Sequence, residues 1–450
     1  MQRNHPAEIR RTLELAAPVM IGLVASFGMN FVDTVMAGRL AEKDVALAAL
    51  ATGGAIWSAV LMFSLGILMA VQPSVAQLDG AGRRAEAGAE ARQAVWLALA
   101  LSVPFALLMN LGGPILGLLD VDGRIIPVAD GYMKALSWGA PGMCLVFLLR
   151  FFSEGTGHTK PTMYIGLLGV VANIPLNWIL MFGKFGMPEL GARGCGYATS
   201  IVIWSQVVLL FTYIRLHRHF TDYRPFEKLD APDRARLRGL LKIGIPIAVT
   251  IFVEGSLFVG AALLIGRLGP IPTAGHLVAI NFSALVFMIP LGLASAVTTR
   301  VGNAVGRGDP DAARYAGLIG FVLVLCTQSV SASVMILFPE WVVGIYTNDP
   351  AIASMAVTLL FYAAIFQFPD GIQICGAGAL RGLKDTLMPM VYNIISYWLI
   401  GLVLGYYLTF EKGMGPAGMW TGMIAGLSAG ALLMSTRFLR RSAALARGGF

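Results

Sequence analysis

Long apolar runs separated by short polar turns make up most of the chain. A transmembrane α-helix needs about 20 mostly apolar residues, because each residue adds 1.5 Å of rise. Turn-forming text such as DGAGRR and GRGDPD marks the ends of the runs. The expected spans lie near residues 12–37, 47–73, 93–113, 131–153, 163–183, 195–215, 240–266, 275–299, 315–338, 352–376, 387–408 and 415–436. The pattern therefore predicts an all-α, polytopic membrane protein with twelve transmembrane helices.

The composition supports this class. Of the 450 residues, 57% are hydrophobic and 13% are charged, whereas soluble domains carry about 25% charged residues. No polar stretch is long enough to form a separate soluble domain. The four cysteines lie in apolar runs without a CxxC motif, so neither disulfides nor metal sites are expected. The polar N-terminal residues precede a long span without a clear cleavage site, so no removable signal peptide is expected.

The distribution of Lys and Arg predicts the orientation. If the N-terminus is inside, 25 of the 33 basic residues fall on the inner side, and eight of them lie between Arg215 and Lys242. This excess follows the positive-inside rule and predicts that both termini are cytoplasmic. Because the basic residues follow the membrane topology, the net charge of +8 does not indicate a nucleic-acid partner.

The two halves of the chain repeat each other. Pro18 in LAAPVMIGL corresponds to Pro246 in IGIPIAVTI, 228 residues later. Further pairs follow in the same order at spacings of 224 to 228 residues: Arg39 with Arg267, Gly82 with Gly308, and Gly191 with Gly415. An even number of spans in each half inserts both halves the same way up, which gives a pseudo-two-fold axis along the membrane normal.

This repeat predicts two pseudo-symmetric six-helix lobes. The expected parts are an N-lobe at residues 1–215, a charged cytoplasmic linker at 216–238 and a C-lobe at 239–450. The end of the linker, DAPDRARLRGLL, is expected to form a short surface helix with Asp230 as a candidate cap. Two lobes of like orientation suit rocking around a site near the midplane, which favours a transporter.

Three acids lie inside expected spans: Asp33, Glu254 and Asp370. A charged side chain at a helix centre costs about 2.5–3.5 kcal/mol, so such residues usually face a cavity or the bundle interior. The repeat duplicates none of them, which favours a role in function over a role in folding. They could take up protons or hold Na⁺; the alternative is a neutral, hydrogen-bonded structural acid. Arg150 and Glu154, four residues apart, are expected to form a structural pair.

Polar neighbours could complete sites around these acids. Pro369 precedes Asp370 and would leave backbone carbonyls free near the carboxyl group, although it could equally be a kink that only packs. Asn173 and Asn177 share a helical face. Their amide oxygens could complete a cation site with Asp33, or the amides could simply bond neighbouring helices.

Aromatic residues near the C-lobe acids are candidates for a cavity wall. They are Phe252, Phe258, Tyr362, Phe366 and Tyr397. Such rings could receive flat, apolar cations by stacking and cation–π attraction. The alternative is that they face lipid or pack in the core.

On this duplicated frame, the sequence resembles the multidrug and toxic compound extrusion (MATE) family in its NorM branch. The matching text is APVMIGLVASFGMNFVDTVMAGRL, which lacks the family's final Gly, then FVEGSLF, PDGIQICGAGALRGLKDT, GARGCGYAT and GPAGMWTG. The resemblance covers essentially the whole chain. It implies a V-shaped pair of lobes that exports organic cations, such as dyes and antimicrobials, in exchange for inward Na⁺ or H⁺.

The resemblance also implies roles for particular residues. In the C-lobe it implies a cation-coupling site of Glu254, Asp370 and Tyr362. In the N-lobe it implies a second site of Asp33, Asn173, Asn177 and Thr199. It assigns Na⁺ to either site and leaves open which lobe couples, because this chain keeps acids in both. No cofactor besides the coupling ion is expected.

Two other functions are less favoured. A flippase for lipids or lipid-linked oligosaccharides shares the two-lobe frame, but an Arg-rich cavity would favour it and the intramembrane charges here are acidic. A membrane enzyme is not expected, because no catalytic dyad or metal cluster is visible in the sequence. The expected protein is a monomer in the bilayer of a bacterial inner membrane, with no nucleic-acid partner.

Overall fold

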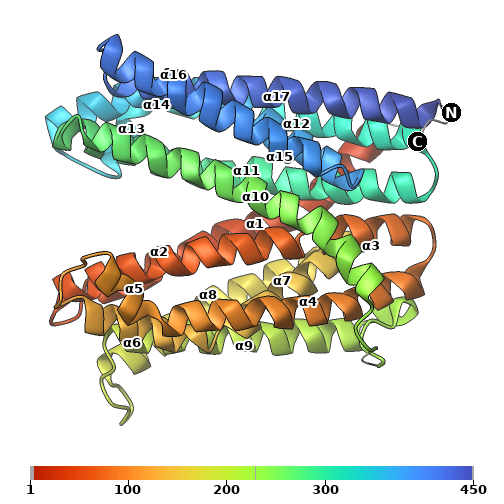
Figure 1. Ribbon diagram of the computed structural model, residues 1–450, viewed down its shortest axis with the longest axis horizontal. Helices are drawn as coiled ribbons and strands as arrows, with labels where there is room; N and C mark the ends of the chain where they lie inside the picture. The colour runs from red at the N-terminus through yellow and green to blue at the C-terminus, as the bar shows by residue number, and fades with distance from the viewer. Residues whose placement is uncertain (1–4, 229, 448–450) are drawn as a thin grey trace. The chain divides into compact units, whose positions relative to one another are not determined.

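The computed structural model describes residues 5–228 and 230–447, and this part of the chain is helical without a strand (Figure 1). Among these described residues, eleven helices are long and apolar enough to cross a membrane. A twelfth span forms when α6 (Ile126–Ser137) and α7 (Ala140–Gly155), which meet at a 47° bend, are counted together. The prediction of an all-α membrane protein with twelve spans is confirmed.

The helices follow the order expected for a duplicated chain. Besides α6 and α7, the first half contains α1 (His5–Ala37), α2 (Lys43–Leu68), α3 (Val71–Gly80), α4 (Arg84–Asn110), α5 (Gly112–Leu118), α8 (Lys160–Phe182) and α9 (Ala192–Leu216). The second half contains α10 (Arg234–Gly266), α11 (Pro270–Gly306), α12 (Pro310–Leu337), α13 (Pro339–Gly344), α14 (Pro350–Gly382), α15 (Leu387–Asn393), α16 (Val403–Tyr406) and α17 (Pro416–Ala446). A 3₁₀ helix, η1 (Arg218–Tyr223), precedes α10, and two π-helical segments, η2 (Ile394–Leu402) and η3 (Tyr407–Glu411), flank α16.

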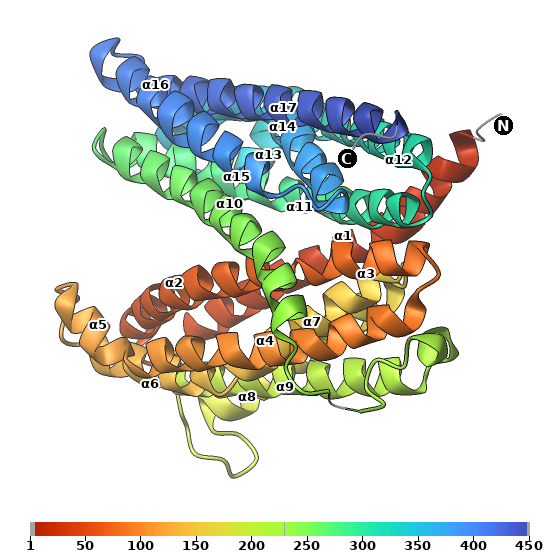
Figure 2. The same cartoon turned by 45° about the vertical axis from the view of Figure 1, so that its right-hand side comes forward.

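Two compact units divide the chain. The first unit contains Ile21–Asp79 and Arg83–Ala248, and in it α9 packs against α6 and α8 (Figure 2). The second unit contains the described parts of Met1–Met20 and Val249–Phe450, together with Gly80–Gly82. In the second unit α14 packs against α11, α12 and α17.

Each unit includes the start of the other half's first helix. In the first unit, Gly66 of α2 lies against α10, where a Cβ added to this glycine would be 2.4 Å from the Cα of Ala248. In the second unit, Gly292 of α11 lies against α1, where an added Cβ would be 3.0 Å from the backbone nitrogen of Met20. The two contacts correspond under the repeat, since Met20 and Ala248 are 228 residues apart. Only glycine lets the backbones approach this closely.

The backbone also repeats where the sequence repeats. Gly191 before α9 has φ 54° and ψ −134°, and Gly415 before α17 has φ 61° and ψ −145°. A positive φ with such a ψ is open almost only to glycine. The equivalent turns therefore need the same residue type in both halves.

The prediction of a short surface helix at the end of the linker is wrong. Its residues from Arg234 onward form the first turns of α10, because buried Leu240 continues the apolar face into the span. Asp233, not Asp230, caps this helix, since its Oδ1 accepts from the backbone N–H of Ala235 at 2.8 Å. Asp230 instead accepts from Arg92 at 2.6 Å.

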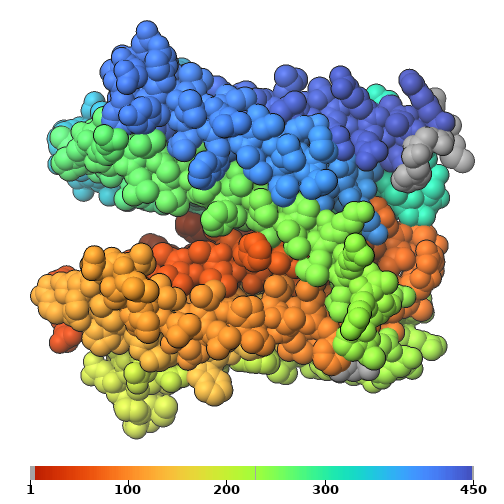
Figure 3. Space-filling model, in the orientation of Figure 1, coloured from red at the N-terminus to blue at the C-terminus, as the bar shows by residue number. Residues whose placement is uncertain are grey.

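The linker lies along α4 (Figure 3). The Arg92 guanidinium donates to the carbonyl of Arg224 as well as to Asp230. The amide of Gln93 donates to the carbonyl of Ala231 at 2.8 Å and accepts from the N–H of Asp233 at 2.7 Å. Because these bonds join side chains of one helix to the linker backbone, the linker is a fixed part of the first unit.

The predicted pair of Arg150 and Glu154 is confirmed. The Arg150 Nε atom lies 2.6 Å from the Glu154 carboxylate, which is almost fully buried. The ion pair joins neighbouring turns of α7.

Candidate functional site

The first unit gathers a buried polar cluster around Asp33 of α1. Asn177 of α8 donates to Asp33 Oδ1 at 2.6 Å and to Asn173 Oδ1 at 2.9 Å. Thr199 of α9 donates to Asp33 Oδ2 at 3.4 Å. Asp33 is 7% exposed and both amides are fully buried. The structure thus brings together all four residues of the N-lobe site that the sequence suggested.

The chemistry of the Asp33 cluster suits a hard cation. Its oxygens come from a carboxylate, two amides and a hydroxyl, which are the donor types that such cations prefer. Within the part of the chain that the structure describes, Asn177 Oδ1 has no hydrogen-bond partner. An unpaired buried acceptor costs about 1–3 kcal/mol, so this oxygen is suited to accept a bond from a ligand.

Sequence reasoning missed Cys195 as a member of the Asp33 cluster. Its thiol, fully buried on α9, lies close enough to the Asp33 carboxylate to interact with it. Cys195 lies one helical turn before Thr199, so both face Asp33 from the same side of α9. This four-residue spacing was the available signal.

The second unit contains the other two acids. Glu254 of α10 and Asp370 of α14 interact electrostatically with each other and with Tyr397. Asp370 is 2% exposed, and among residues 5–228 and 230–447 its Oδ1 has no hydrogen-bond partner. Glu254 is only partly buried. Two neighbouring carboxylates inside a bundle still repel each other and are costly to keep charged unless cations or protons offset them.

Arg381 supplies part of that compensation. This side chain, 7% exposed, interacts electrostatically with Glu254. Arg381 lies in the last turn of α14, because this helix continues to Gly382. The apolar residues from Ile374 to Leu380 were the signal that the helix extends past the expected end at residue 376.

Buried amides flank Asp370 on α14. Gln367 and Gln373 lie three residues before and after it, and both are fully buried. Gln328 of α12 donates to Gln367 Oε1 at 2.9 Å, and Gln373 donates to Asn393 Oδ1 at 3.3 Å. The spacing of three residues places the amides near Asp370 along α14, and this spacing was the available signal in the sequence.

A π-helical segment faces the same region. The expected plain span at residues 387–408 contains η2, which carries Ser396 and Tyr397. Both hydroxyl oxygens are buried and have no hydrogen-bond partner in the described chain. Such widened turns often occur at functional sites, because they leave backbone and side-chain groups available.

Four of the five candidate wall aromatics gather in one apolar cluster. Phe366 and Tyr397 are buried in it, and Phe258 and Tyr362 pack against it. Phe258 meets Phe366 edge-on, with ring centroids 6.1 Å apart. Phe252 is not part of this cluster, since its side chain is 56% exposed. That these rings contact a substrate stays a prediction.

The family comparison matches this chain twice. The MatE family pattern fits residues 18–179 and again residues 246–407, which agrees with the 228-residue repeat. A relative named "Probable multidrug resistance protein NorM", from Xanthomonas campestris pv. campestris, is 44% identical over 98% of this chain and 96% of its own length. "Multidrug resistance protein PmpM" from Pseudomonas aeruginosa is 41% identical over 96% of this chain and 92% of its own length.

Solved structures share the fold. A MATE structure in complex with MaD3S superposes with a TM-score of 0.89 at 19% identity, covering 98% of this chain and 97% of that chain. The eukaryotic MATE transporter AtDTX14 superposes with a TM-score of 0.86 at 20% identity, covering 98% and 99%. At these identities, the likeness concerns the fold alone.

Proposed function

Because the chain belongs to the MatE family, we propose that it exports organic-cation drugs and toxic compounds across a bacterial inner membrane in exchange for Na⁺ or H⁺. Relatives named as multidrug resistance proteins over nearly their full length support the multidrug part. The observation that carries the exchange part is the placement of three carboxylates inside the bundle, each with polar neighbours from other helices or turns. We expect no enzymatic activity and no cofactor besides the ion.

The Asp33 cluster is the better candidate for Na⁺. Its carboxylate, amide and hydroxyl oxygens converge from three helices, and Asn177 Oδ1 remains available. A bound ion would offset the charge of Asp33, as would a proton. Either ligand would weaken the attraction of the site for a cationic drug.

The pair of Glu254 and Asp370 is the better candidate for H⁺. With Arg381 charged, the two carboxylates leave one uncompensated negative charge. A single proton, or a single monovalent organic cation, neutralises the remainder. The two ligands therefore compete for one charge, which is the requirement for exchange.

Linkage fixes the energetics of the exchange. If the coupling ion lowers the affinity for the drug by some factor, the drug lowers the affinity for the ion by the same factor. Ion entry from outside would then release the drug outward and favour return of the emptied transporter. The excess of basic residues on one side supports cytoplasmic termini, and we propose that a monomer is the working unit.

Dye efflux from proteoliposomes tests this proposal. Na⁺ and H⁺ gradients are imposed separately on the wild type and on Asp33→Asn, Glu254→Gln and Asp370→Asn. We expect Asp33→Asn to abolish Na⁺-driven efflux and the other two variants to abolish H⁺-driven efflux. Glu340→Gln, at an exposed position on α13, is the control and should transport normally. Wild-type efflux by all three site variants under both gradients would refute the proposal.

A further inference from the structure

A shallow, open depression in the protein surface, called the hollow below, lies along the beginning of α10, within the first unit. Two cations, Arg238 and Lys242, line it together with small and apolar residues that include Gly239, Leu241 and Ile245. Neither acidic cluster contributes a residue to it.

The two cations of the hollow are available to a ligand. Arg238 and Lys242 are four residues apart, so they share a helix face with Cβ atoms about 6 Å from each other. Both are exposed, and neither forms an ion pair or side-chain hydrogen bond with another described residue. By contrast, Arg236 lies 3.6 Å from Glu90 and 3.6 Å from Asp233. The positive charges of Arg238 and Lys242 are thus not neutralised by local ion pairs.

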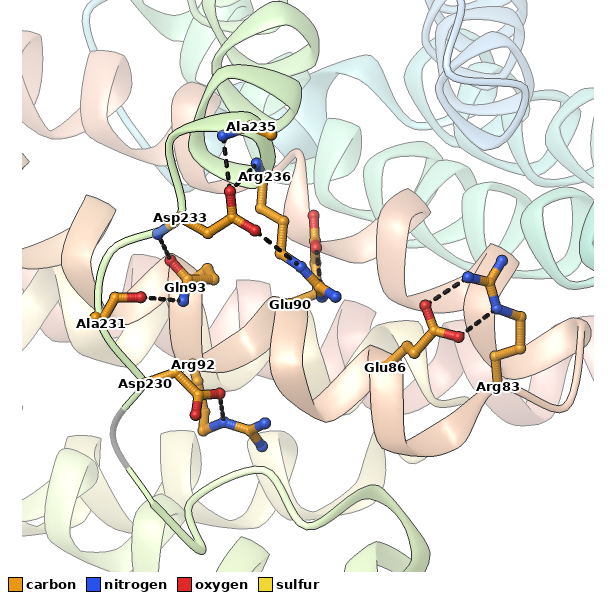
Figure 4. Close-up of polar contacts among 10 residues, drawn as sticks. All are labelled: Arg83, Glu86, Glu90, Arg92, Gln93, Asp230, Ala231, Asp233, Ala235 and Arg236. Atoms are coloured by element: carbon orange, nitrogen blue, oxygen red, sulfur yellow. Dashed lines mark hydrogen bonds and ion pairs between the residues drawn. The ribbon is translucent and has the colours of Figure 1, made fainter.

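The backbone that carries these cations is held in place (Figure 4). Asp233 caps α10, and Gln93 of α4 accepts from the backbone N–H of Asp233. Arg236 adds a charged contact between α10 and α4. A ligand would not have to order this segment, which lowers the entropic cost of binding.

The hollow lies where charge gives way to apolar surface along α10. Lys242 directly precedes the apolar run that begins at Ile243. Ile245, seven residues after Arg238 and so on the same helix face, is 45% exposed. In the proposed orientation, this position is the cytoplasmic membrane interface. A ligand that fits would have an anionic end and an apolar body.

We propose that this hollow binds the head group of an anionic phospholipid from the cytoplasmic leaflet. Its phosphate lies between Arg238 and Lys242, where the guanidinium and ammonium groups donate charge-assisted hydrogen bonds to phosphate oxygens. An acyl chain follows the exposed side of Ile245. A zwitterionic lipid is a poorer ligand because its own ammonium group competes for the phosphate, and free phosphate lacks the apolar contact.

Native mass spectrometry of the purified full-length protein tests this site. Phosphatidylglycerol, phosphatidylcholine and inorganic phosphate are titrated separately, and bound adducts are counted. The double variant Arg238→Gln/Lys242→Gln should bind phosphatidylglycerol roughly 30-fold more weakly, since each cation near an anionic leaflet contributes about 1 kcal/mol. The control Arg218→Gln/Arg440→Gln removes the same charge at exposed positions outside the hollow and should bind like the wild type.

Three outcomes would overturn the proposal: equal loss in both double variants, equal binding of phosphatidylcholine, or inorganic phosphate displacing the lipid. The first would mean that net charge alone attracts the lipid, and the last would mean a site for free anions. The variants should match the wild type in thermal unfolding, because both side chains are exposed. The readout is lipid binding, so a negative result leaves the proposed efflux function untouched.

Discussion

A stack of histidines outside the membrane spans should make the protein sensitive to acid. His158, between α7 and α8, stacks on His219 with ring centroids 4.6 Å apart, and its Nε2 lies 2.9 Å from the Tyr213 hydroxyl. His217 is the next ring, at 5.1 Å. Partial burial, and then the charges that the neighbouring histidines and Lys160 would carry, lower the pKa of His158 to about 4.

The sign of the effect follows from the two pKa values. In the unfolded chain His158 titrates near its ordinary pKa of 6.5, above the folded value of about 4. As the pH falls from 6.5 to 4, the unfolded state takes up a proton that the folded state refuses, so the free energy of unfolding decreases. The full difference would correspond to about 3 kcal/mol. Because His158 is only half-buried, solvent screening reduces this to about 1–2 kcal/mol.

Thermal unfolding in detergent between pH 8 and pH 4.5 measures this dependence. The variant His158→Gln keeps a polar side chain of similar size without the titration, so its melting temperature should fall less with acidification than that of the wild type. Hydrogen exchange of residues 156–160 and 217–223 localises the effect, since acid should open this stack first. Parallel pH profiles for wild type and variant, with unchanged local exchange, would refute the reasoning.

Three further predictions concern the helix contacts and the acidic sites. Gly66→Ala should destabilise the protein by about 1–3 kcal/mol in thermal unfolding, since its Cβ would overlap α10, whereas Gly54→Ala, with open space around it, should be neutral. Arg381→Gln should lower thermal stability by about 2 kcal/mol and impair H⁺-driven efflux, because it leaves the partly buried carboxylate of Glu254 without its cation; Arg381→Lys should restore both in part. Asn177→Leu should abolish any stabilisation by added Na⁺ in a melting assay, as it removes an amide from the Asp33 cluster; persistence of that stabilisation would exclude the cluster as the sodium site.

The sequence was sufficient for features that depend on position along one helix. Span lengths, the duplication, and the shared face of Asn173 and Asn177 all follow from residue spacing within a helix. The approach of Thr199 to Asp33 came from family resemblance, since spacing alone does not show which helices meet.

Features that depend on contacts between helices were missed. Cys195 and Gln328 are polar partners only because another helix lies opposite them. The π-helical turns around Ser396 lie where η2 packs closely against α17, since a Cβ on Gly426 would lie 2.5 Å from the Ser396 carbonyl oxygen. The prediction of a separate surface helix was wrong because the charged residues from Arg234 onward resembled a separate element. Their leucines in fact continue the apolar face of α10.

The exchanged beginnings of α1 and α10 bear on how such a chain could have arisen. In a single six-helix protein, nothing would pack against the glycine of the second helix, because the helix that contacts Gly66 or Gly292 belongs to the other half of the chain. Two copies could have covered each other's second helix by exchanging the beginnings of their first helices, as in a domain-swapped dimer. A fusion of two such copies would place the boundary between the sequence repeats away from the boundary between the compact units, as is found here.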